Sequence, residues 1–378
     1  MSVVLDFPGP RRVAAERRPV KRCLFVGLGG IGQRHLRNLR ALRGDTVEVH
    51  AFRVRRERAL LSDTLQILPG EELEATYGVR AHAELDAALA TKPDVVFVSN
   101  PSSLHVEVTR RALEASAHVF VEKPLSHDLS GVAGLVEDAA RRGLAGNVAY
   151  QLRFHPGFRR AAELVQGRAL GRLLFAEATV GEYLPGFHPY EDYRRMYASR
   201  RELGGGVTLS QIHEIDSLMA LLGRPERVFS SGGKLSSLEV DVDDVSSSLL
   251  EFRGEGGRVL PVRLHQDFVQ RPAERRLVLV GEQGKLEWSL SGKSFKRWDE
   301  SGALCEELDF ADFPRNRLFE DELSHFLRCV ETGESPSCSL ADGAESLAVA
   351  LSILESQASG LPVNVGAVLD RAGLGGAA

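Results

Sequence analysis

The chain contains little cysteine and no long hydrophobic run. Its four cysteines, Cys23, Cys305, Cys329 and Cys338, form neither a C-x-x-C pair nor a His–Cys cluster at zinc spacing. No stretch approaches the ~18 consecutive apolar residues that a membrane-spanning helix needs. We therefore expect no metal site and no membrane partner, and the cysteine usage favours a reducing, cytoplasmic location.

The chain also has no excess of positive charge. Its 47 Lys and Arg residues are outnumbered by 52 Asp and Glu, which excludes a polycation built to coat nucleic acid. Lysine is rare, because only seven of the 47 basic residues are lysines and the others are arginines. Arginine is therefore the default cation here, and a lysine in a special setting is more informative than an arginine cluster. The content of 43% hydrophobic and 26% charged residues is that of a globular protein.

Between residues 21 and 150, short apolar runs alternate with segments of helical periodicity. Buried-strand candidates lie at 23–26, 47–52, 94–98 and 118–121, and helical repeats separate them. A repeated order of strand and helix predicts parallel pairing with crossover helices. We expect residues 21–150 to form an α/β Rossmann-type domain with a doubly wound parallel sheet.

The pattern changes after residue 150. Several later segments are polar at every second position, which predicts a sheet with one solvated or partner-covered face. We expect residues 151–365 to form a C-terminal α+β domain with a large, mainly antiparallel open sheet. Residues 1–20 are predicted to be a basic N-terminal arm and residues 366–378 a flexible tail. The β-rich runs of the second domain are 173–183, 226–235, 245–253, 258–269, 275–281 and 284–298.

A glycine-rich motif follows the first predicted strand directly. Gly27, Gly29 and Gly32, with Gly30 and Ile31 between them, match the pattern G-x-G-x-x-G. A strand precedes the motif and a helix follows it, so its glycines can form a tight turn that approaches a pyrophosphate at the helix N-terminus. This context predicts that all five residues bind a dinucleotide.

An acidic residue is missing where the adenosine ribose is usually held, about 20 residues after the glycine motif. The second strand ends in Arg53 within AFRVRR at 51–56. An arginine can pair with a 2′-phosphate, so the sequence favours NADP(H) over NAD(H). Arg34 and His35, in the first turn of the first helix, either face the pyrophosphate or cap polar surface, and we favour the former.

Four segments resemble the Gfo/Idh/MocA family of NAD(P)-dependent oxidoreductases. They are VVFVSNP at 95–101, HVFVEKPL at 118–125, YQLRFHP at 150–156, and the triple glycine at 204–206 that leads to a histidine. The resemblance extends over about residues 21–365. It implies a cofactor of the NAD(P) type and a carbohydrate substrate.

The resemblance implies a cofactor site at the carboxyl ends of the strands. It places Lys123 beside the nicotinamide and the reacting hydroxyl, as a catalytic and cofactor-binding residue. Ligands of open α/β sheets collect at this edge, so the position of the lysine agrees with that role. The further cofactor-binding residues that the resemblance implies are Ser99, Asn100, Pro101, His105, Glu122 and Gln151.

His213 is the second catalytic residue that the resemblance implies. A histidine titrates at about pH 6.5 when unperturbed, which suits a general base. Family members usually carry an aspartate upstream on the same helical face, and Ser210 takes its place here. We expect Ser210 and His213 to contact the substrate, and Glu214 and Asp216 to point elsewhere.

Arg153, Tyr193 and Arg194 are the remaining substrate candidates. Arg153 follows the last strand of the first domain, where the family lines its cleft. Tyr193 and Arg194 lie in an aromatic and basic loop at 183–197. This loop either stacks on a sugar ring and binds a phosphate, or it is a packed excursion anchored by aromatic residues.

Together these features predict an oxidoreductase that transfers a hydride between nicotinamide and a ring hydroxyl or ketone of a sugar, sugar nucleotide or cyclitol. Oxidation of a secondary alcohol also releases a proton, so Lys123 and His213 must reach the same carbinol. The alternatives are a glycosidase of the same family that retains NAD, and a non-catalytic NAD(P)-binding module. The resemblance further implies a homodimer or homotetramer that assembles through the C-terminal sheet.

Overall fold

The computed structural model describes residues 19–53, 59–62, 66–188 and 190–375. Residues 1–18, most of the expected basic arm, lie outside this description. The chain divides into two compact units. The first unit comprises Met1–Ala149 and Asn316–Ala344, and the second comprises Tyr150–Arg315 and Glu345–Ala378.

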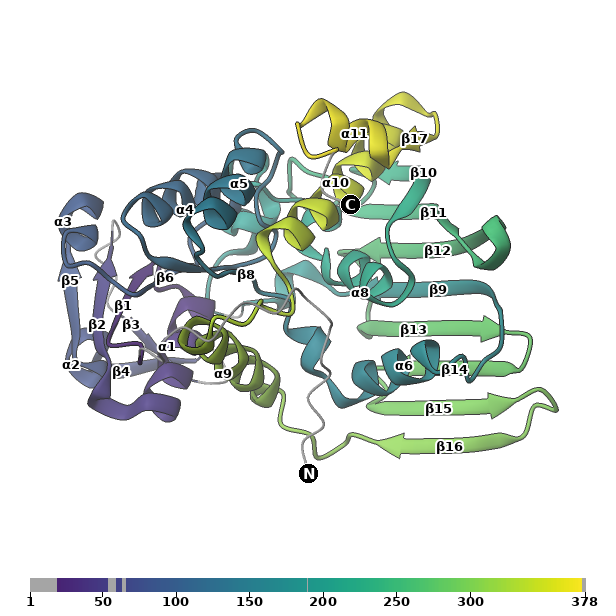
Figure 1. The fold of residues 1–378 in the computed structure, drawn as a ribbon, viewed down its shortest axis with the longest axis horizontal. Helices are drawn as coiled ribbons and strands as arrows, with labels where there is room; N and C mark the ends of the chain where they lie inside the picture. Colours follow the sequence, from purple (N-terminus) through teal and green to yellow (C-terminus); the bar gives the residue numbers. More distant parts are fainter. Residues whose placement is uncertain (1–18, 54–58, 63–65, 189, 376–378) are drawn as a thin grey trace. The chain divides into compact units, whose positions relative to one another are not determined.

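The first unit contains a parallel sheet of six strands in the order β5-β2-β1-β6-β7-β8. Helices α1 and α9 lie on one face of this sheet, and α4 and α5 lie on the other (Figure 1). This is the predicted doubly wound arrangement. The bounds are β1 Arg22–Val26, α1 Gly30–Arg43, β2 Glu48–Phe52, β3 Ala59–Leu61, β4 Ile67–Glu72, α2 Leu73–Tyr77, β5 Val79–His82, α3 Leu85–Leu89, β6 Val95–Val98, α4 His105–Glu114, β7 His118–Val121, α5 Val132–Arg142, β8 Gly146–Val148 and α9 Asn316–Thr332.

The central strands form because their residues are apolar on both sides. Phe25 of β1 and Phe97 of β6 are direct neighbours in the register, and their rings stack with 4.4 Å between centroids. A strand that is covered by helices on both faces needs such a continuous apolar run. The hydrophobic core of the first unit therefore lies along β1 and β6, next to the glycine-rich turn.

The return of residues 316–344 to the first unit differs from the prediction, which assigns all of 151–365 to one domain. Helix α9 is amphipathic, and its buried Leu323, Phe326 and Leu327 join the core cluster that contains Leu36 of α1. The spacing of these residues predicts a helix with one apolar face, but it does not say which unit covers that face.

The second unit is built on a mixed sheet of nine strands in the order β16-β15-β14-β13-β9-β12-β11-β10-β17. Only the pair β12 and β9 is parallel, so the predicted, mainly antiparallel sheet is confirmed. The bounds are α6 Pro156–Gln166, β9 Leu173–Gly181, α7 Val207–Ser210, α8 His213–Leu222, β10 Pro225–Gly233, β11 Val245–Arg253, β12 Val259–Asp267, β13 Glu274–Gly281, β14 Gly284–Ser289, β15 Ser294–Asp299, β16 Leu304–Asp309, α10 Leu340–Ser359, β17 Val363–Asn364 and α11 Val365–Arg371.

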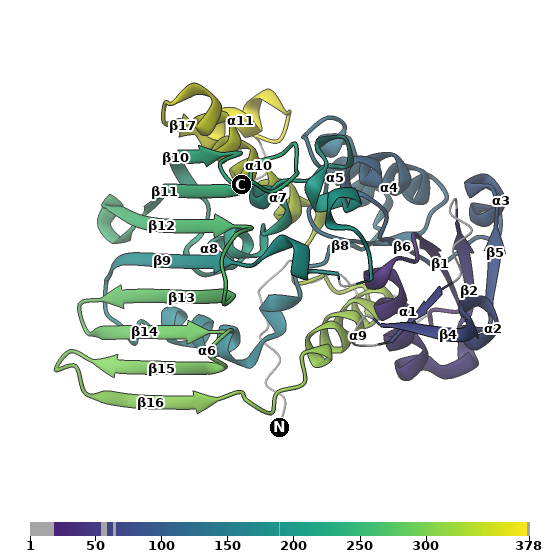
Figure 2. The same ribbon diagram turned by 180° about the vertical axis from the view of Figure 1, so that it is seen from behind.

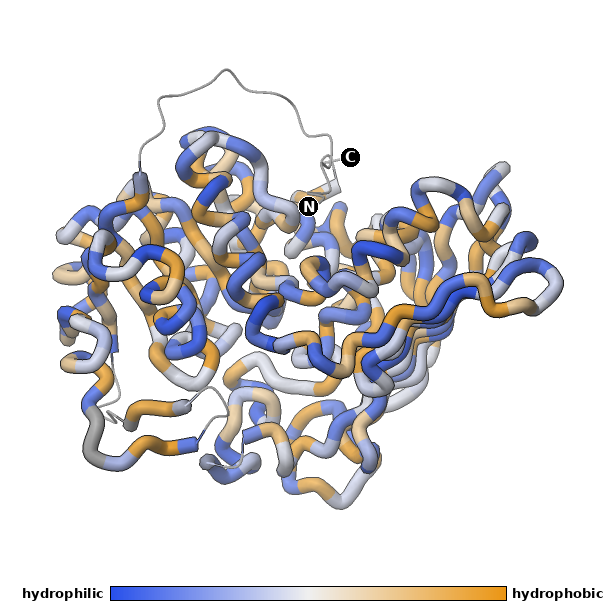
Figure 3. Tube along the Cα trace, turned by 90° about the horizontal axis from the view of Figure 1, so that it is seen from below, coloured by the Kyte–Doolittle hydropathy of each residue, from blue (hydrophilic) through white to orange (hydrophobic). Residues whose placement is uncertain are grey.

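One face of the large sheet is covered by α6 and α8, as Figures 1 and 2 show from opposite sides. Residues that alternate along each strand point to this face or away from it. Leu250 and Val262 pair on the buried face, whereas Leu249 and Arg263 pair on the other. Figure 3 shows the chain coloured by hydropathy, with hydrophilic and hydrophobic residues both present along the strands of the large sheet.

The predicted flexible tail at 366–378 is wrong for its first part, because helix α11 extends to Arg371. Asn364 caps this helix by accepting the N–H of Ala367, at 2.9 Å. Val365 and Leu369 are buried, so the helix is held by its apolar side chains. Across the described ranges, no helix has the length and apolar character to cross a membrane.

Candidate active site

The glycine-rich turn between β1 and α1 requires glycine at two positions. Gly27 has a φ of +96°, and a Cβ there would lie 2.7 Å from the carbonyl carbon of Ser99. A Cβ at Gly32 would lie 2.4 Å from the carbonyl oxygen of Gly27. Backbone atoms cannot move away as a flexible side chain can, so any larger residue would push the turn away from β6.

Gly29 differs from these two glycines because it opens to free space. It is the N-cap of α1, and a Cβ there would meet no atom within 4 Å. No acidic residue lies in the first turn of α1, which begins with Gly30 and Ile31. A helix N-terminus with exposed N–H groups and no competing carboxylate attracts an anion. This cradle fits the pyrophosphate of a dinucleotide.

Ser99, Asn100 and Pro101 follow β6, at the same edge of the sheet as the glycine-rich turn. The Ser99 hydroxyl donates to the carbonyl oxygen of Gly27 at 2.7 Å. Ser99 therefore fixes the turn from the neighbouring strand. The carboxyl ends of β1, β6 and β7 are adjacent in the register, so Gly27, Asn100 and Lys123 share one edge.

His105 has a different role from the expected cofactor contact. Its side chain is buried, with Nδ1 2.9 Å from the carbonyl oxygen of Pro124 and Nε2 2.9 Å from that of Asn100. Burial lowers the pKa of this histidine. Because both ring nitrogens contact the protein backbone, His105 connects the turn after β6 to the turn after β7. Its role is therefore to hold these two turns together.

Glu122 binds His35 of α1, which corrects the expectation that His35 faces the pyrophosphate. His35 Nε2 lies 2.7 Å from Glu122 Oε1, and the ring is buried at 4.9 Å from that of Phe120. Glu122 Oε2 also accepts the backbone N–H of Lys123, at 3.3 Å. Glu122 therefore connects helix α1 to the end of β7, where Lys123 lies.

Arg34 also turns away from the expected pyrophosphate contact. Its guanidinium donates to the side chain of Asn316 at 3.2 Å and lies 4.8 Å from the centre of the Phe319 ring. Both partners belong to α9, which the sequence pattern does not place beside α1. Arg34 therefore helps to hold α9 on the first unit.

Arg53 is paired with a glutamate that sequence reasoning missed. Arg53 Nη1 lies 2.5 Å from Glu74 Oε1, and Glu74 belongs to the short helix α2. The backbone N–H of Arg53 donates to the carbonyl oxygen of His82 in β5, at 3.3 Å. Residues 54–58, which include the rest of the arginine cluster, lie outside the described residues. The predicted cation at the end of β2 thus stands next to an anion.

His213 is the first residue of α8 and lies in the second unit, where Gln151 contacts it. Gln151 Nε2 is 3.3 Å from His213 Nε2, and the ring of Tyr150 meets that of His213 edge-on at 5.6 Å. His213 is buried. The amide N–H of Gln151 can donate only to an unprotonated Nε2, which is the form of a general base.

Arg153, predicted to contact the substrate, forms a fork with Asp216 instead. Arg153 Nε donates to Asp216 Oδ2 at 2.9 Å, and Nη2 donates to Oδ1 at 2.6 Å. Asp216 is buried in α8, so the pair fixes the turn over Gln151–Phe154 to this helix. Glu214 pairs with Arg275 at 2.8 Å. Both acids are therefore paired with arginines, and Arg153 makes a structural contact with α8.

Ser210 and His213 do not share one continuous helical face. Helix α7 ends at Ser210, and Gln211 has φ −101° and ψ 34°, which interrupts the helix before α8 begins. Gln211 is held at this break by β12, because its side chain donates to the carbonyl oxygen of Asp267 at 3.0 Å. The chain between Ser210 and His213 is therefore not one regular helix, as the interval of three residues assumes.

The loop at 183–197 contains its own small core, which fits the packed interpretation. Leu184 and Met196 are buried there, and Tyr193 packs against this cluster. The Tyr193 hydroxyl accepts the N–H of Glu239 at 3.2 Å. Arg194 pairs with Asp192 at 2.8 Å and with Glu239 at 3.1 Å. The two substrate candidates of this loop therefore make structural contacts within the second unit.

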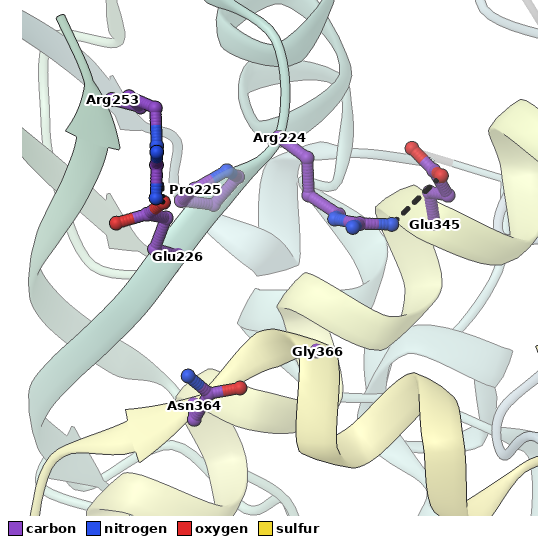
Figure 4. Close-up of a pocket in the computed structure, with 7 residues that line it drawn as sticks. All are labelled: Arg224, Pro225, Glu226, Arg253, Glu345, Asn364 and Gly366. Carbon is purple, nitrogen blue, oxygen red and sulfur yellow. Dashed lines mark hydrogen bonds and ion pairs between the residues drawn. The ribbon is translucent and has the colours of Figure 1, made fainter. Parts of the chain in front are cut away.

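A cavity of about 660 Å³ lies elsewhere in the second unit (Figure 4). Arg224 pairs with Glu345 at 3.0 Å, and Arg253 pairs with Glu226 at 2.6 Å. None of the predicted site residues lines it, and its opposite charges compensate one another. Its lining is Arg224, Pro225, Glu226, Arg253, Glu345, Asn364 and Gly366.

Comparison with known proteins agrees with this geometry. Residues 21–150 match the oxidoreductase family with an NAD-binding Rossmann fold, and residues 158–287 match the GFO/IDH/MocA C-terminal domain. The chain is 26% identical to myo-inositol 2-dehydrogenase of Thermotoga maritima over 329 residues, which are 85% of this chain and 92% of that protein. It is 27% identical to 1,5-anhydro-D-fructose reductase of Ensifer adhaerens over 274 residues, 71% of this chain and 78% of that protein.

A solved structure shows the same fold. The WlbA dehydrogenase from Bordetella pertussis, in complex with NADH and UDP-GlcNAcA, superposes with a TM-score of 0.73 at 22% identity, over 92% of this chain and 99% of that one. The matched family domains and the similar enzymes identify the chain as an NAD(P)-dependent oxidoreductase. The two domain matches together span more than half of the chain, which belongs to the Gfo/Idh/MocA oxidoreductase family.

Proposed function

We propose that the protein oxidises a ring hydroxyl, or reduces a ring ketone, of a sugar, sugar nucleotide or cyclitol. The observation that carries this proposal is the edge of the first sheet, where the pyrophosphate cradle follows β1 and Lys123 follows β7, with the end of β6 between them. The relatives named above act on a cyclitol or an anhydro sugar, and the WlbA structure holds a sugar nucleotide. All of these compounds contain a ring with secondary hydroxyl groups.

Lys123 is proposed to stabilise the oxygen of the reacting carbon. Its ammonium follows β7, and Glu122 holds its backbone N–H. When bound, the nicotinamide ring supplies the hydride acceptor or donor. A cation next to the alkoxide stabilises the charge that develops as the hydride leaves. Asn100, on the neighbouring strand end, is proposed to orient the cofactor.

His213 is proposed to take the hydroxyl proton at Nε2. Gln151 Nε2 lies 3.3 Å from this nitrogen, and a substrate hydroxyl would replace the amide as the donor. Lys123 belongs to the first unit and His213 to the second. We propose that both side chains approach the same carbinol of the substrate. We further propose that the substrate-binding part of the site is shaped by Ser210, Arg153, Tyr193 and Arg194, through the contacts described above.

For the cofactor we propose NADP(H) with only a modest preference over NAD(H). Arg53 supplies a cation at the end of β2, but Glu74 partly compensates its charge. The proposed location is the cytoplasm, where the buried thiols of Cys23, Cys329 and Cys338 would stay reduced.

We also propose that the protein forms an even-numbered homo-oligomer through the second sheet. On the face opposite α6 and α8, Phe229 and Leu249 are paired across β10 and β11, and each is 43% exposed. Phe175 and Val259 are also exposed. Such exposed apolar residues on one face of a sheet favour a self-complementary contact between two copies.

The test of the activity is stopped-flow absorbance of reduced nicotinamide with a panel of sugars, sugar nucleotides and cyclitols. We expect Lys123→Met to lower kcat about 100-fold or more while the affinity for NADPH changes by less than about threefold. Turnover of Lys123→Met at the wild-type rate would contradict the role of the lysine. Release of a leaving group without accumulation of reduced cofactor would instead indicate the retained-NAD glycosidase, and cofactor binding without turnover on the whole panel would indicate a non-catalytic module.

A further inference from the structure

Arg53 occupies a fixed position beside the glycine-rich turn. Phe52 pairs with Val26 in the parallel register of β2 and β1, so Arg53 emerges at the same edge as Gly27. The hydrogen bond from its backbone N–H to His82 fixes where its side chain begins. In folds of this kind the residue at the end of the second strand meets the adenosine ribose.

Glu74 lies beside Arg53 at the end of β2 and forms an ion pair with it. The two side chains meet at 2.5 Å, and they are only 11% and 21% exposed. The second carboxylate oxygen, Glu74 Oε2, is buried and has no hydrogen-bond partner in the part of the chain that the structure describes. No second donor therefore shares the charge of this carboxylate at Oε2, and the charge acts on the guanidinium of Arg53.

We infer that Arg53 and Glu74 act together as the determinant of cofactor choice, with Glu74 opposing the 2′-phosphate that Arg53 attracts. A guanidinium by itself would pair with the 2′-phosphate of NADP(H). A carboxylate at hydrogen-bond distance from that guanidinium competes for its N–H groups and repels the phosphate. The pair thus accommodates both a 2′-hydroxyl and a 2′-phosphate. This inference rests on the dinucleotide site of the proposed function, and not on the identity of the substrate.

A simple surface ion pair would not explain the same features. Exposed pairs contribute little and are screened by solvent. Arg53 and Glu74 are instead largely covered, so their charges act on one another, and on a neighbouring ligand, with less screening. The placement at the end of β2 gives the pair a ligand to act on, whereas a merely structural pair would not change nucleotide preference when one partner is neutralised.

The experiment uses the full chain and two nucleotide fragments that differ at one position. Adenosine 2′,5′-bisphosphate and 5′-AMP share the adenine, the ribose and the 5′-phosphate, so the ratio of their Kd values measures the contribution of the 2′-phosphate. Isothermal titration calorimetry is performed on the wild type, Glu74→Gln and Arg53→Gln. Glu74→Gln keeps the shape of the side chain and removes its charge.

We expect opposite shifts from the two variants. Glu74→Gln should increase the preference for the 2′-phosphate about tenfold, which corresponds to ~1.4 kcal/mol, and Arg53→Gln should decrease it by a similar factor. The affinity for 5′-AMP should change by less than about threefold in both. Circular dichroism identifies a variant that does not fold, and the other variant then decides the question by itself.

A ratio that stays within about twofold of the wild type in the folded variants would overturn the inference. Failure of the wild type to bind either fragment would overturn both the inference and the proposed dinucleotide site. Opposite shifts in a protein that turns over no sugar would support the inference while contradicting the proposed activity, so the two failures are distinguishable.

Discussion

At the scale of single residues, several histidines of this chain serve the structure and not the chemistry. His155 is the clearest case, because it is buried between Trp288, Phe310 and Phe313. Its Nδ1 caps helix α6 by accepting the N–H of Gly157 at 3.0 Å. Burial lowers its pKa to about 4, so the ring stays neutral and able to cap the helix near pH 7.

This shift predicts a loss of stability in acid. The unfolded chain binds a proton on His155 at its ordinary pKa of 6.5, whereas the folded chain does so only near 4, so the contribution is complete above 6.5 and decreases as the pH falls towards 4. We expect a loss of about 3 kcal/mol in the free energy of unfolding over this range. Urea unfolding at several pH values measures it.

The matched variant is His155→Asn, which keeps a capping oxygen but has no group that titrates in this range. We expect it to be less stable than the wild type at pH 7, because it loses contacts with three aromatic rings. The difference in stability between wild type and variant should shrink as the pH falls from 6.5 to 4. A difference that does not depend on pH would contradict the assigned shift.

At the scale of elements, the glycine-rich turn contains one glycine that the fold requires and another that the fold does not require. Gly27 is required by the fold, since a Cβ would collide with the backbone of Ser99 and the φ of +96° disfavours other residues. Gly29 is not required by the fold, since a Cβ there would enter open space. Two neighbouring glycines of one motif therefore serve different ends.

We expect Gly27→Ala and Gly29→Ala to behave differently. Gly27→Ala should lower the free energy of unfolding by about 3 kcal/mol. Gly29→Ala should change it by less than about 1 kcal/mol but weaken NADPH binding at least tenfold, because its methyl group would occupy the pyrophosphate cradle. Thermal unfolding and NADPH fluorescence titration distinguish the two effects. Unchanged NADPH affinity in Gly29→Ala would show that the pyrophosphate does not lie over this residue.

The elements also show what a sequence can predict. The β1 strand, the glycine-rich turn and the lysine after β7 follow from local patterns, because a buried parallel strand and a tight turn constrain their own residues. The partners of the site residues do not. Glu74 and Asp216 pair with arginines that are 21 and 63 positions away in the sequence, and no local periodicity reports such a contact.

At the scale of the whole molecule, the exposed sheet face predicts self-association. We expect multi-angle light scattering to give a mass that is two or four times that of the chain. Leu249→Lys should shift the protein towards the monomer, because it places a charge among the exposed apolar side chains around Phe229. Arg263→Lys, directly opposite Leu249 on the same face, is the control that keeps the charge. A wild type that stays monomeric at all concentrations would contradict the proposed interface.

The domain organisation shows the same limit of sequence reasoning on a larger scale. The prediction of two domains captures both sheets, but the chain crosses between the units after residues 149, 315 and 344. The sequence of α9 predicts an amphipathic helix, but it does not indicate which unit the helix packs against. Its destination depends on the complementary surface that α1 offers, through residues that lie more than 270 positions earlier.

These three crossings have a consequence for biosynthesis. The first unit lacks part of its residues until the ribosome has translated residue 344, because residues 316–344 complete it, and the second unit is completed only by the residues that follow. The first unit is therefore not expected to fold completely on the ribosome before most of the second unit has been synthesised. The nascent polypeptide must keep the uncovered side of β1 and α1 from aggregating for most of its synthesis, which makes this protein a strong candidate for chaperone assistance.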